Sequence, residues 1–304
     1  MQLLDAAELR RRLPMPVAID ALEAGFRQHD PSAGPLRSHV VTPGGSLLLM
    51  PAIGEGGVGV KLVTLTPSNP ERHLPLIGAV YVLFDATTQT PEAIVDGAAL
   101  TSLRTAAVSG LATRHLANPD AARLMIFGAG VQARSHLDAM LGVRRIEHVT
   151  VVSRTLPRAQ ALVDAARERG VGADVGVSDD VADADLVCTC TTSDLPLFDG
   201  ARLSAGTHVN AVGSFQPTSR ELDTAALLRA RVVVEAREAA FSEAGELAIP
   251  IGEGAFDRDH VVADLAQVVN GAHVRLTPSA VTVFKSVGLA FEDLIVARAA
   301  VDAA

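Results

Sequence analysis

The middle of the chain alternates short apolar runs with amphipathic stretches, a pattern typical of strands joined by helices. Ala122 to Phe127 is an apolar run of strand length, Val131 to Leu141 has helical spacing, and Ile146 to Val152 is a second strand. Further strands separated by alanine-rich helices are expected at Gly172 to Val177, Asp185 to Thr191, Thr207 to Val212 and Val232 to Ala236. This alternation predicts a doubly wound parallel sheet.

The segments on either side have a different pattern. Two amphipathic helices, Ala6 to Arg12 and Pro16 to Gln28, precede short strands punctuated by Pro and Gly, which indicates a mainly antiparallel sheet. These strands are expected at Arg37 to Val41, Ser46 to Met50, Val58 to Leu65 and Gly78 to Asp85. An alanine-rich helix from Gly97 to Leu116 follows, and a last helix from Ser286 to Ala303 is expected to pack on the N-terminal part. We therefore predict an α/β protein with a Rossmann-type sheet and a discontinuous α+β domain.

The first strand of the central unit runs into the turn Gly128-Ala129-Gly130-Val131-Gln132-Ala133. This G-x-G-x-x-A sequence lies between a predicted strand and a predicted helix, the context in which such a turn binds a pyrophosphate. Gly128 permits the tight turn, Gly130 the close approach of the backbone to phosphate, and Ala133 the packing of helix on strand. The alternative is a glycine-rich turn without a ligand.

The second strand of this unit ends in Ser153-Arg154-Thr155, where an NAD-binding unit carries an acidic residue for the ribose hydroxyls. No carboxylate is present there. Arg154 can pair with a 2′-phosphate, Ser153 and Thr155 can donate to it, and Arg158 adds charge one helical turn later. We therefore expect NADP(H) rather than NAD(H), with a merely solvated Arg154 as the alternative.

Composition narrows the class of protein. A formal charge of −9 without a basic block argues against a nucleic-acid partner, and no apolar run reaches the length of a membrane span. The N-terminal residues lack a secretory pattern, so a cytoplasmic location is expected. Cys188 and Cys190 share one face of a predicted strand and are expected to be buried, and the histidines show no zinc-binding spacing, so no metal is expected.

Three isolated cations in the N-terminal region are candidates for binding an anionic substrate: Arg37, Lys61 and Arg104. Lys61 has apolar neighbours on both sides, an unfavourable place for a cation without an anionic partner. A bound carboxylate would provide that partner. The alternatives are an internal ion pair with Asp85 or Asp96, or extension of the side chain into solvent.

Several motifs in the same order resemble the ornithine cyclodeaminase/mu-crystallin family over nearly the whole chain. They are Gly59 to Thr64 (GVKLVT), Leu100 to Ser109 (LTSLRTAAVS), the Gly128 to Ala133 turn, Arg220 to Asp223 (RELD) and Phe284 to Ala290 (FKSVGLA). The resemblance implies a homodimer built through the N-terminal sheet, a Rossmann domain, and a 2-imino or 2-amino acid bound between the two domains. On this basis residues 1–116 and 280–304 are expected to form the substrate-binding and dimerisation domain, and 117–279 the NADP(H)-binding domain.

The resemblance also implies roles for individual residues. Arg37, Lys61 and Arg104 would bind the substrate carboxylate, and Lys61 would also be catalytic if it protonates the imine, for which water is an equal alternative. The expected cofactor-binding set is Gly128, Gly130, Val131, Gln132, Ser153, Arg154, Thr155, Arg158, Thr191, Val212, Gly213, Ser286 and Gly288. Phe215 occupies the position of an Asp that cyclising members of the family use, and it is expected to contact the substrate ring. An apolar ring cannot accept a proton, which disfavours ornithine cyclodeamination.

These residues together favour NADPH-dependent reduction of a cyclic 2-carboxy imine, such as pyrroline-2-carboxylate or piperideine-2-carboxylate, to the amino acid. One alternative is an NAD-dependent ornithine cyclodeaminase or amino-acid dehydrogenase. Another is a non-catalytic protein that binds a ligand in the presence of NADPH, because the fold does not decide between catalysis and binding.

Overall fold

A computed structural model describes residues 1–29, 31, 34–54 and 56–303. The chain forms two compact units. The first, unit 1, combines Met1–Arg104 with Leu289–Ala304, and the second, unit 2, is Thr105–Gly288. Helix α3 (Gly97–Leu116) begins in unit 1 and ends in unit 2, so the boundary falls within a continuous helix.

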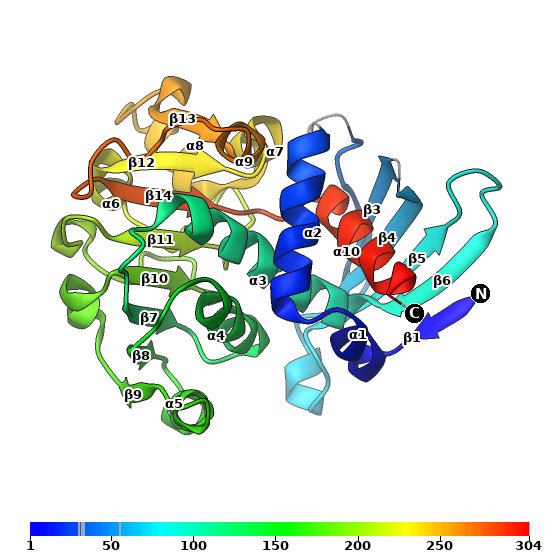
Figure 1. Ribbon diagram of the computed structural model, residues 1–304, viewed down its shortest axis with the longest axis horizontal. Helices are drawn as coiled ribbons and strands as arrows, with labels where there is room; N and C mark the ends of the chain where they lie inside the picture. Colours follow the sequence, from blue (N-terminus) through cyan, green and yellow to red (C-terminus); the bar gives the residue numbers. More distant parts are fainter. Residues whose placement is uncertain (30, 32–33, 55, 304) are drawn as a thin grey trace. The chain divides into compact units, whose positions relative to one another are not determined.

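Unit 1 contains a six-stranded mixed sheet in the order β1-β6-β5-β4-β3-β2 (Figure 1). The strands are β1 (Gln2–Leu4), β2 (Ser38–Thr42), β3 (Gly45–Gly54), β4 (Gly57–Leu65), β5 (Ile77–Phe84) and β6 (Pro91–Asp96). Neighbouring strands from β2 to β6 run antiparallel, and only β1 pairs in parallel, with β6. The described residues of this unit also form helices α1 (Ala6–Arg12), α2 (Met15–Gln28) and α10 (Ala290–Asp302), the short 3₁₀ helix η2 (Asn69–Arg72) and the first part of α3.

The two faces of the unit 1 sheet differ in burial. Alternate residues of β4 and β5, including Lys61, Val63 and Tyr81, are buried on the face where α10 packs against β3, β4 and β5 (Figure 1). Residues that point to the other face, such as Val60 and Val82, are apolar but only half-buried. The sheet therefore has one face inside the unit's core and one apolar face that is partly exposed.

Unit 2 contains an eight-stranded, entirely parallel sheet in the order β13-β12-β14-β11-β10-β7-β8-β9. The strands are β7 (Arg123–Phe127), β8 (His148–Val152), β9 (Gly172–Val175), β10 (Leu186–Thr189), β11 (His208–Ala211), β12 (Ala230–Val234), β13 (Val261–Asp264) and β14 (Val281–Lys285). The helices between them are α4 (Val131–Val143), α5 (Leu156–Glu168), α6 (Thr224–Arg229), α7 (Arg237–Glu243), α8 (Gly245–Gly252) and α9 (Leu265–Val269).

Strand order reverses next to β7, because β8 follows on one side and β10 on the other. Such a switch point leaves a crevice at the carboxyl ends of the strands, where doubly wound proteins bind dinucleotides. The Gly128 turn directly follows β7. The topology thus places the predicted turn where a nucleotide site is expected.

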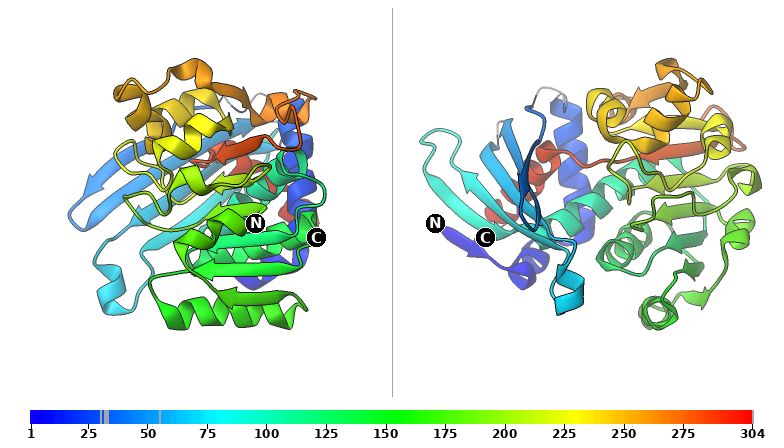
Figure 2. Two further views of the ribbon diagram at one scale, coloured as in Figure 1. Left: turned by 90° about the vertical axis from the view of Figure 1, so that its left-hand side faces the viewer. Right: turned by 180° about the vertical axis from the view of Figure 1, so that it is seen from behind.

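The predicted fold class is confirmed, whereas some elements were predicted wrongly or missed. The last helix begins at Ala290 rather than Ser286, and the residues before Ser286, Val281–Lys285, form β14, which lies between β11 and β12 (Figures 1 and 2). Strands β1, β6 and β13 were not predicted either. All are short, and a short apolar run is ambiguous between a strand and a buried helical turn. Arg37, expected in a strand, directly precedes β2.

Candidate active site

The glycine turn after β7 has the geometry that its sequence predicts. Gly128 has a φ of +105°, and a Cβ there would lie 2.6 Å from the carbonyl oxygen of Cys190, so only glycine fits. Gly130 is the N-cap of α4, and a Cβ there would meet nothing within 4 Å. Ala133 is fully buried. The first glycine is therefore required by the fold, and the second leaves open space at a helix N-terminus, which suits a phosphate.

Gln132, the second residue of α4, has a buried hydrogen-bond acceptor that lacks a donor among the described residues. Val131 is largely exposed, whereas the amide oxygen Oε1 of Gln132 is buried and accepts no hydrogen bond from the part of the chain that the structure describes. A buried acceptor without a donor is costly, and a hydroxyl of a bound ribose would supply a donor. The turn and this amide oxygen therefore fit a dinucleotide.

A basic, exposed loop follows β8. Arg154 and Arg158 are exposed, and neither forms an ion pair with any described residue. Thr155 is the N-cap of α5 and donates its backbone N–H to Ser153 Oγ at 3.3 Å. The first turn of α5 contains no acidic residue. Cations at a helix N-terminus are unfavourable unless an anion accompanies them, so this loop has the charge expected of a phosphate-binding site.

The loops after β10 and β11 are joined by a buried carboxylate that the sequence reasoning did not assign. Glu221 accepts hydrogen bonds from Thr189 Oγ1 at 2.7 Å, from Thr191 Oγ1 at 2.6 Å, and from the backbone N–H groups of Thr191 and Gly213, both at 2.8 Å. A Cβ at Gly213 would lie 2.2 Å from the Thr191 carbonyl oxygen, so Gly213 is needed for this close approach. Burial raises the pKa of Glu221.

This arrangement changes how two predicted cofactor residues can act. The Thr191 hydroxyl donates to Glu221 and also accepts from the Ser193 N–H at 3.1 Å, so it has little capacity left for a ligand. Val212 donates its backbone N–H to Thr189 at 3.2 Å. Both residues thus shape the carboxyl edge of the sheet through the backbone and through Glu221.

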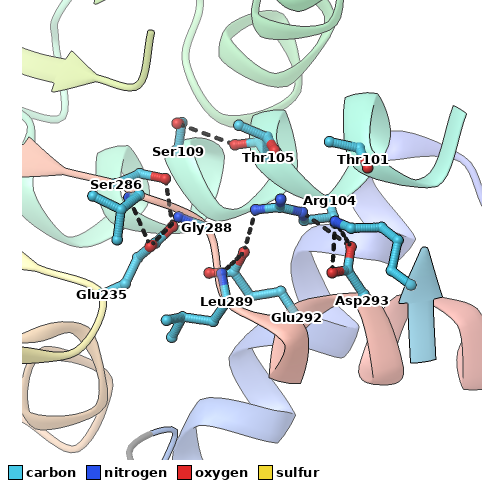
Figure 3. Close-up of polar contacts among 12 residues, drawn as sticks. Thr101, Arg104, Thr105, Ser109, Glu235, Ser286, Gly288, Leu289, Glu292 and Asp293 are labelled. Carbon is cyan, nitrogen blue, oxygen red and sulfur yellow. Dashed lines mark hydrogen bonds and ion pairs between the residues drawn. The ribbon is translucent and has the colours of Figure 1, made fainter. Parts of the chain in front are cut away.

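A second unassigned carboxylate, Glu235, holds the turn between β14 and α10 (Figure 3). Glu235 accepts from Ser286 Oγ at 2.5 Å and from the backbone N–H groups of Val287 at 3.0 Å and Gly288 at 2.7 Å. Gly288 has a φ of +80°, which favours glycine. The Ser286 hydroxyl therefore binds Glu235, and the turn that includes two predicted cofactor residues is fixed by a carboxylate at the end of β12.

Two of the three predicted substrate cations meet in the core of unit 1. Lys61 Nζ lies 2.9 Å from Oδ1 and 2.7 Å from Oδ2 of Asp293, and Arg104 Nε lies 3.1 Å from the same Oδ1. Arg104 Nη1 also lies 2.8 Å from Oε2 of Glu292, as Figure 3 shows for Arg104 and the two carboxylates. All four side chains are buried. We call Lys61, Arg104, Glu292 and Asp293 the cation cluster.

Burial and neighbouring charges set the protonation of this cluster. Burial, and then the positive charges of Arg104 and Arg37, lower the pKa of Lys61 to about 8, although Asp293 opposes the shift. Arg37, half-buried before β2, is therefore close enough to act on Lys61. Lys61, Arg104 and Arg37 thus lie close enough to affect one another, next to the carboxylates of Asp293 and Glu292.

Tyr81 lies beside Lys61 on the neighbouring strand, in register with it. Its hydroxyl is buried without a hydrogen-bond partner among the described residues, and it occupies the space where Gly59 has no side chain. Burial, and then the charge of Asp293, raise the pKa of Tyr81 well above its usual value. Tyr81 thus remains a neutral phenol, with a buried donor near the cation cluster.

The internal ion pair considered as an alternative for Lys61 is present, but its partner is Asp293 rather than Asp85 or Asp96. Asp85 accepts hydrogen bonds from the backbone of Thr87 and Thr88 in its own turn, and Asp96 accepts from the first N–H groups of α3. Extension into solvent is also wrong, because Lys61 is 1% exposed and Arg104 5%. Phe215 lies in unit 2, half-buried in the loop after β11.

No group of three or more His, Cys, Asp or Glu side chains among the described residues could hold a metal ion. No helix within the described ranges is long and apolar enough to cross a membrane.

The parallel sheet, its switch point and the glycine turn define a Rossmann-fold oxidoreductase. The chain belongs to the ornithine cyclodeaminase/mu-crystallin family, whose pattern matches residues 2–304. The resemblance inferred from the sequence motifs is thereby confirmed.

Relatives of known name share most of the chain. A Delta(1)-pyrroline-2-carboxylate reductase of Bacillus cereus is 40% identical over 258 residues, 83% of this chain and 79% of the relative. The solved Delta(1)-pyrroline-2-carboxylate reductase of Thermococcus litoralis, in complex with NADH and L-proline, matches with a TM-score of 0.94 and 32% identity, over 100% of this chain and 97% of the other. An archaeal alanine dehydrogenase dimer with bound NAD has a TM-score of 0.93 and 30% identity, over 100% and 95% of the two chains.

Proposed function

We propose that this protein is an imine reductase that converts pyrroline-2-carboxylate to proline with a reduced nicotinamide dinucleotide. The observation that carries the proposal is the burial of two cations, Lys61 and Arg104, in one cluster of a chain that also has a complete dinucleotide turn. The names of the bacterial and archaeal relatives support the same substrate.

The reaction adds a hydride to the imine carbon and a proton to the imine nitrogen, so the C=N bond becomes CH–NH. A bound reduced nicotinamide supplies the hydride. Lys61, Arg104 and Arg37 bind the substrate carboxylate, and the burial of Lys61 and Arg104 strengthens their contacts because water does not compete for them. With a pKa of about 8, Lys61 is charged at neutral pH and is also able to release a proton to the imine nitrogen.

The chain's own residues also account for the exclusion of cyclodeamination. That reaction needs a group that accepts a proton from an amine, and Phe215 has no such atom. Phe215 instead offers an apolar surface, which suits the aliphatic part of a cyclic imine. Reduction therefore agrees with the residues present better than the alternative reaction does.

We propose that the enzyme prefers NADP(H), although both solved relatives described above hold NADH or NAD. The support is local: Arg154 and Arg158 are exposed and unpaired with described carboxylates at the end of β8, where no acidic residue can bind a 2′-hydroxyl. Substitution of Arg154 by Asp should lower affinity for NADPH more than for NADH. Equal affinity changes for both cofactors, measured by fluorescence titration, would show that the 2′-phosphate does not bind there.

We further propose that unit 1 binds the substrate and forms a homodimer, and that the enzyme is cytoplasmic. The half-buried apolar residues on one face of its sheet, such as Val60, Leu62, Val80 and Val82, are an unusual surface to leave in water. Sedimentation analysis of the purified protein tests the assembly, and a monomer at micromolar concentration would contradict it.

The proposed activity is tested by following oxidation of NADPH and NADH with pyrroline-2-carboxylate, piperideine-2-carboxylate and iminosuccinate. We expect turnover with a cyclic imine. Tight binding of the dinucleotide without turnover on any imine would favour a ligand-binding protein instead.

A further inference from the structure

Asp293 has an unusual position for a carboxylate. It lies in the first turns of α10, is fully buried, and contacts Lys61 through both oxygens and Arg104 through Oδ1. Lys61 is on β4 and Arg104 on α3, so one carboxylate joins side chains from three elements. A buried carboxylate is costly unless it is paired well, and this one is paired with two cations.

The helix that carries Asp293 restricts where its carboxylate can lie. Glu292 accepts from the Leu289 N–H at 3.4 Å and from Arg104, which fixes the start of α10. The positive end of the helix dipole favours carboxylates in this turn. The Asp293 carboxylate therefore has a fixed position. Its ion pair with Lys61 restricts the long Lys61 side chain, which otherwise has several rotamers.

We propose that Asp293 is a positioning residue for the reduction: it aligns the Lys61 ammonium with the Arg104 guanidinium and keeps Lys61 charged until the substrate carboxylate arrives. This inference rests on the proposed function. An ammonium has three N–H groups, so contact with Asp293 leaves Lys61 with donor capacity for a ligand.

The charges around Lys61 determine the effect of removing Asp293. Arg104 from α3 and Arg37 from the segment before β2 oppose the ammonium, Asp293 favours it, and the neutral phenol of Tyr81 lies beside it on β5. Glu292 lies next to Asp293 and pairs with Arg104. Without the charge of Asp293, the pKa of Lys61 falls below about 8, so the ammonium is lost at a lower pH.

The test compares Asp293→Asn, which removes the charge at nearly constant shape, with Asp293→Glu, which retains it. Glu292→Gln is the matched control, because it removes an equally buried carboxylate from the same turn whose described side-chain partner is Arg104. For each protein, KM and kcat for pyrroline-2-carboxylate and the affinity for L-proline are measured across pH. Dinucleotide affinity and circular dichroism report whether each variant is folded.

For Asp293→Asn we expect KM to increase about tenfold at neutral pH, the size of one lost charge-assisted contact. The rise of KM on the alkaline side should begin at a lower pH than in the parent. Asp293→Glu should restore the position of this rise, and Glu292→Gln should change KM without moving it. A folded Asp293→Asn protein with the parent's pH dependence of KM and of proline affinity would overturn the inference.

Failure of the proposed function gives a different result. In that case the parent protein itself neither oxidises reduced dinucleotide with the imine nor binds L-proline. If the parent does both and the Asp293→Asn profile is unchanged, only the role of Asp293 is refuted.

Discussion

Replacement of Lys61 by Met separates the structural role of the cation cluster from its role in catalysis. The Met side chain fills a similar volume without charge, and among the described residues it leaves Arg104 as the cation paired with Asp293 in the core of unit 1. Breaking one partner of a buried pair costs about 3 kcal/mol in free energy of unfolding, at the low end of the usual range because Arg104 remains. Loss of the ammonium from the substrate carboxylate costs about 2 to 5 kcal/mol.

The second value corresponds to a decrease in kcat/KM of roughly 30-fold to several thousandfold, since about 1.4 kcal/mol is a factor of ten. The assay is imine-dependent oxidation of the dinucleotide, with urea unfolding and dinucleotide titration on the same samples. Arg123→Met, which removes an exposed cation with only long ion pairs, is the control and should leave all three measurements near the parent's values.

A double variant, Lys61→Met with Asp293→Leu, tests the reasoning most sharply. Removing both charges of a buried pair is often neutral for stability, so the double variant should recover most of the lost free energy of unfolding but none of the activity. Lys61→Met and Asp293→Leu are also measured singly. The assigned coupling is wrong if Lys61→Met alone retains activity, or if the double variant loses as much free energy of unfolding as the two single variants lose added together.

Further predictions concern the nucleotide turn and acid stability. Gly128→Ala should lower the free energy of unfolding by at least about 1 to 2 kcal/mol because of its positive φ, and should weaken dinucleotide binding. Gly130→Ala, where space is open, should weaken binding while thermal unfolding stays near the parent's, so equal binding by this variant would contradict the phosphate assignment. Burial lowers the pKa of His208 to about 3 and of His136 to about 4, so the unfolded state takes up protons first. The free energy of unfolding is therefore highest above about pH 6.5, and it falls as pH decreases toward 4, by about 1 to 2 kcal/mol per histidine near pH 5. Urea midpoints that do not change between pH 7 and pH 5 would contradict this prediction.

Local patterns predicted the nucleotide-binding half of the fold well, because each feature depends on neighbours in sequence. Gly128 and Gly130 lie between a strand and a helix that periodicity alone identifies, and the structure gives each the conformation that its role needs. Strand β14 was missed because its five residues carry no alternation, and every one of them is buried in the sheet.

The partners of buried charges could not be predicted in the same way. Lys61 and Asp293 are 232 residues apart, and the sequence around either residue does not indicate that the other is its partner. Asp85 and Asp96 were nearer in sequence, but each binds backbone N–H groups of its own turn or helix start, a use that the following Thr-Thr and Ala-Ala pairs could have indicated. Glu235 directly follows the apolar run Val232 to Val234, so its position at the end of a strand could have been noticed, but the turn that it binds could not be deduced from the sequence.

We propose that the buried cations of unit 1 and the dinucleotide turn of unit 2 both serve imine reduction. The most direct measurement is the rate at which purified protein oxidises NADPH and NADH with pyrroline-2-carboxylate, with chromatographic detection of proline. We predict proline formed in equal amount to dinucleotide oxidised, faster with NADPH. Dinucleotide that binds tightly but is not consumed with this imine would contradict this proposal.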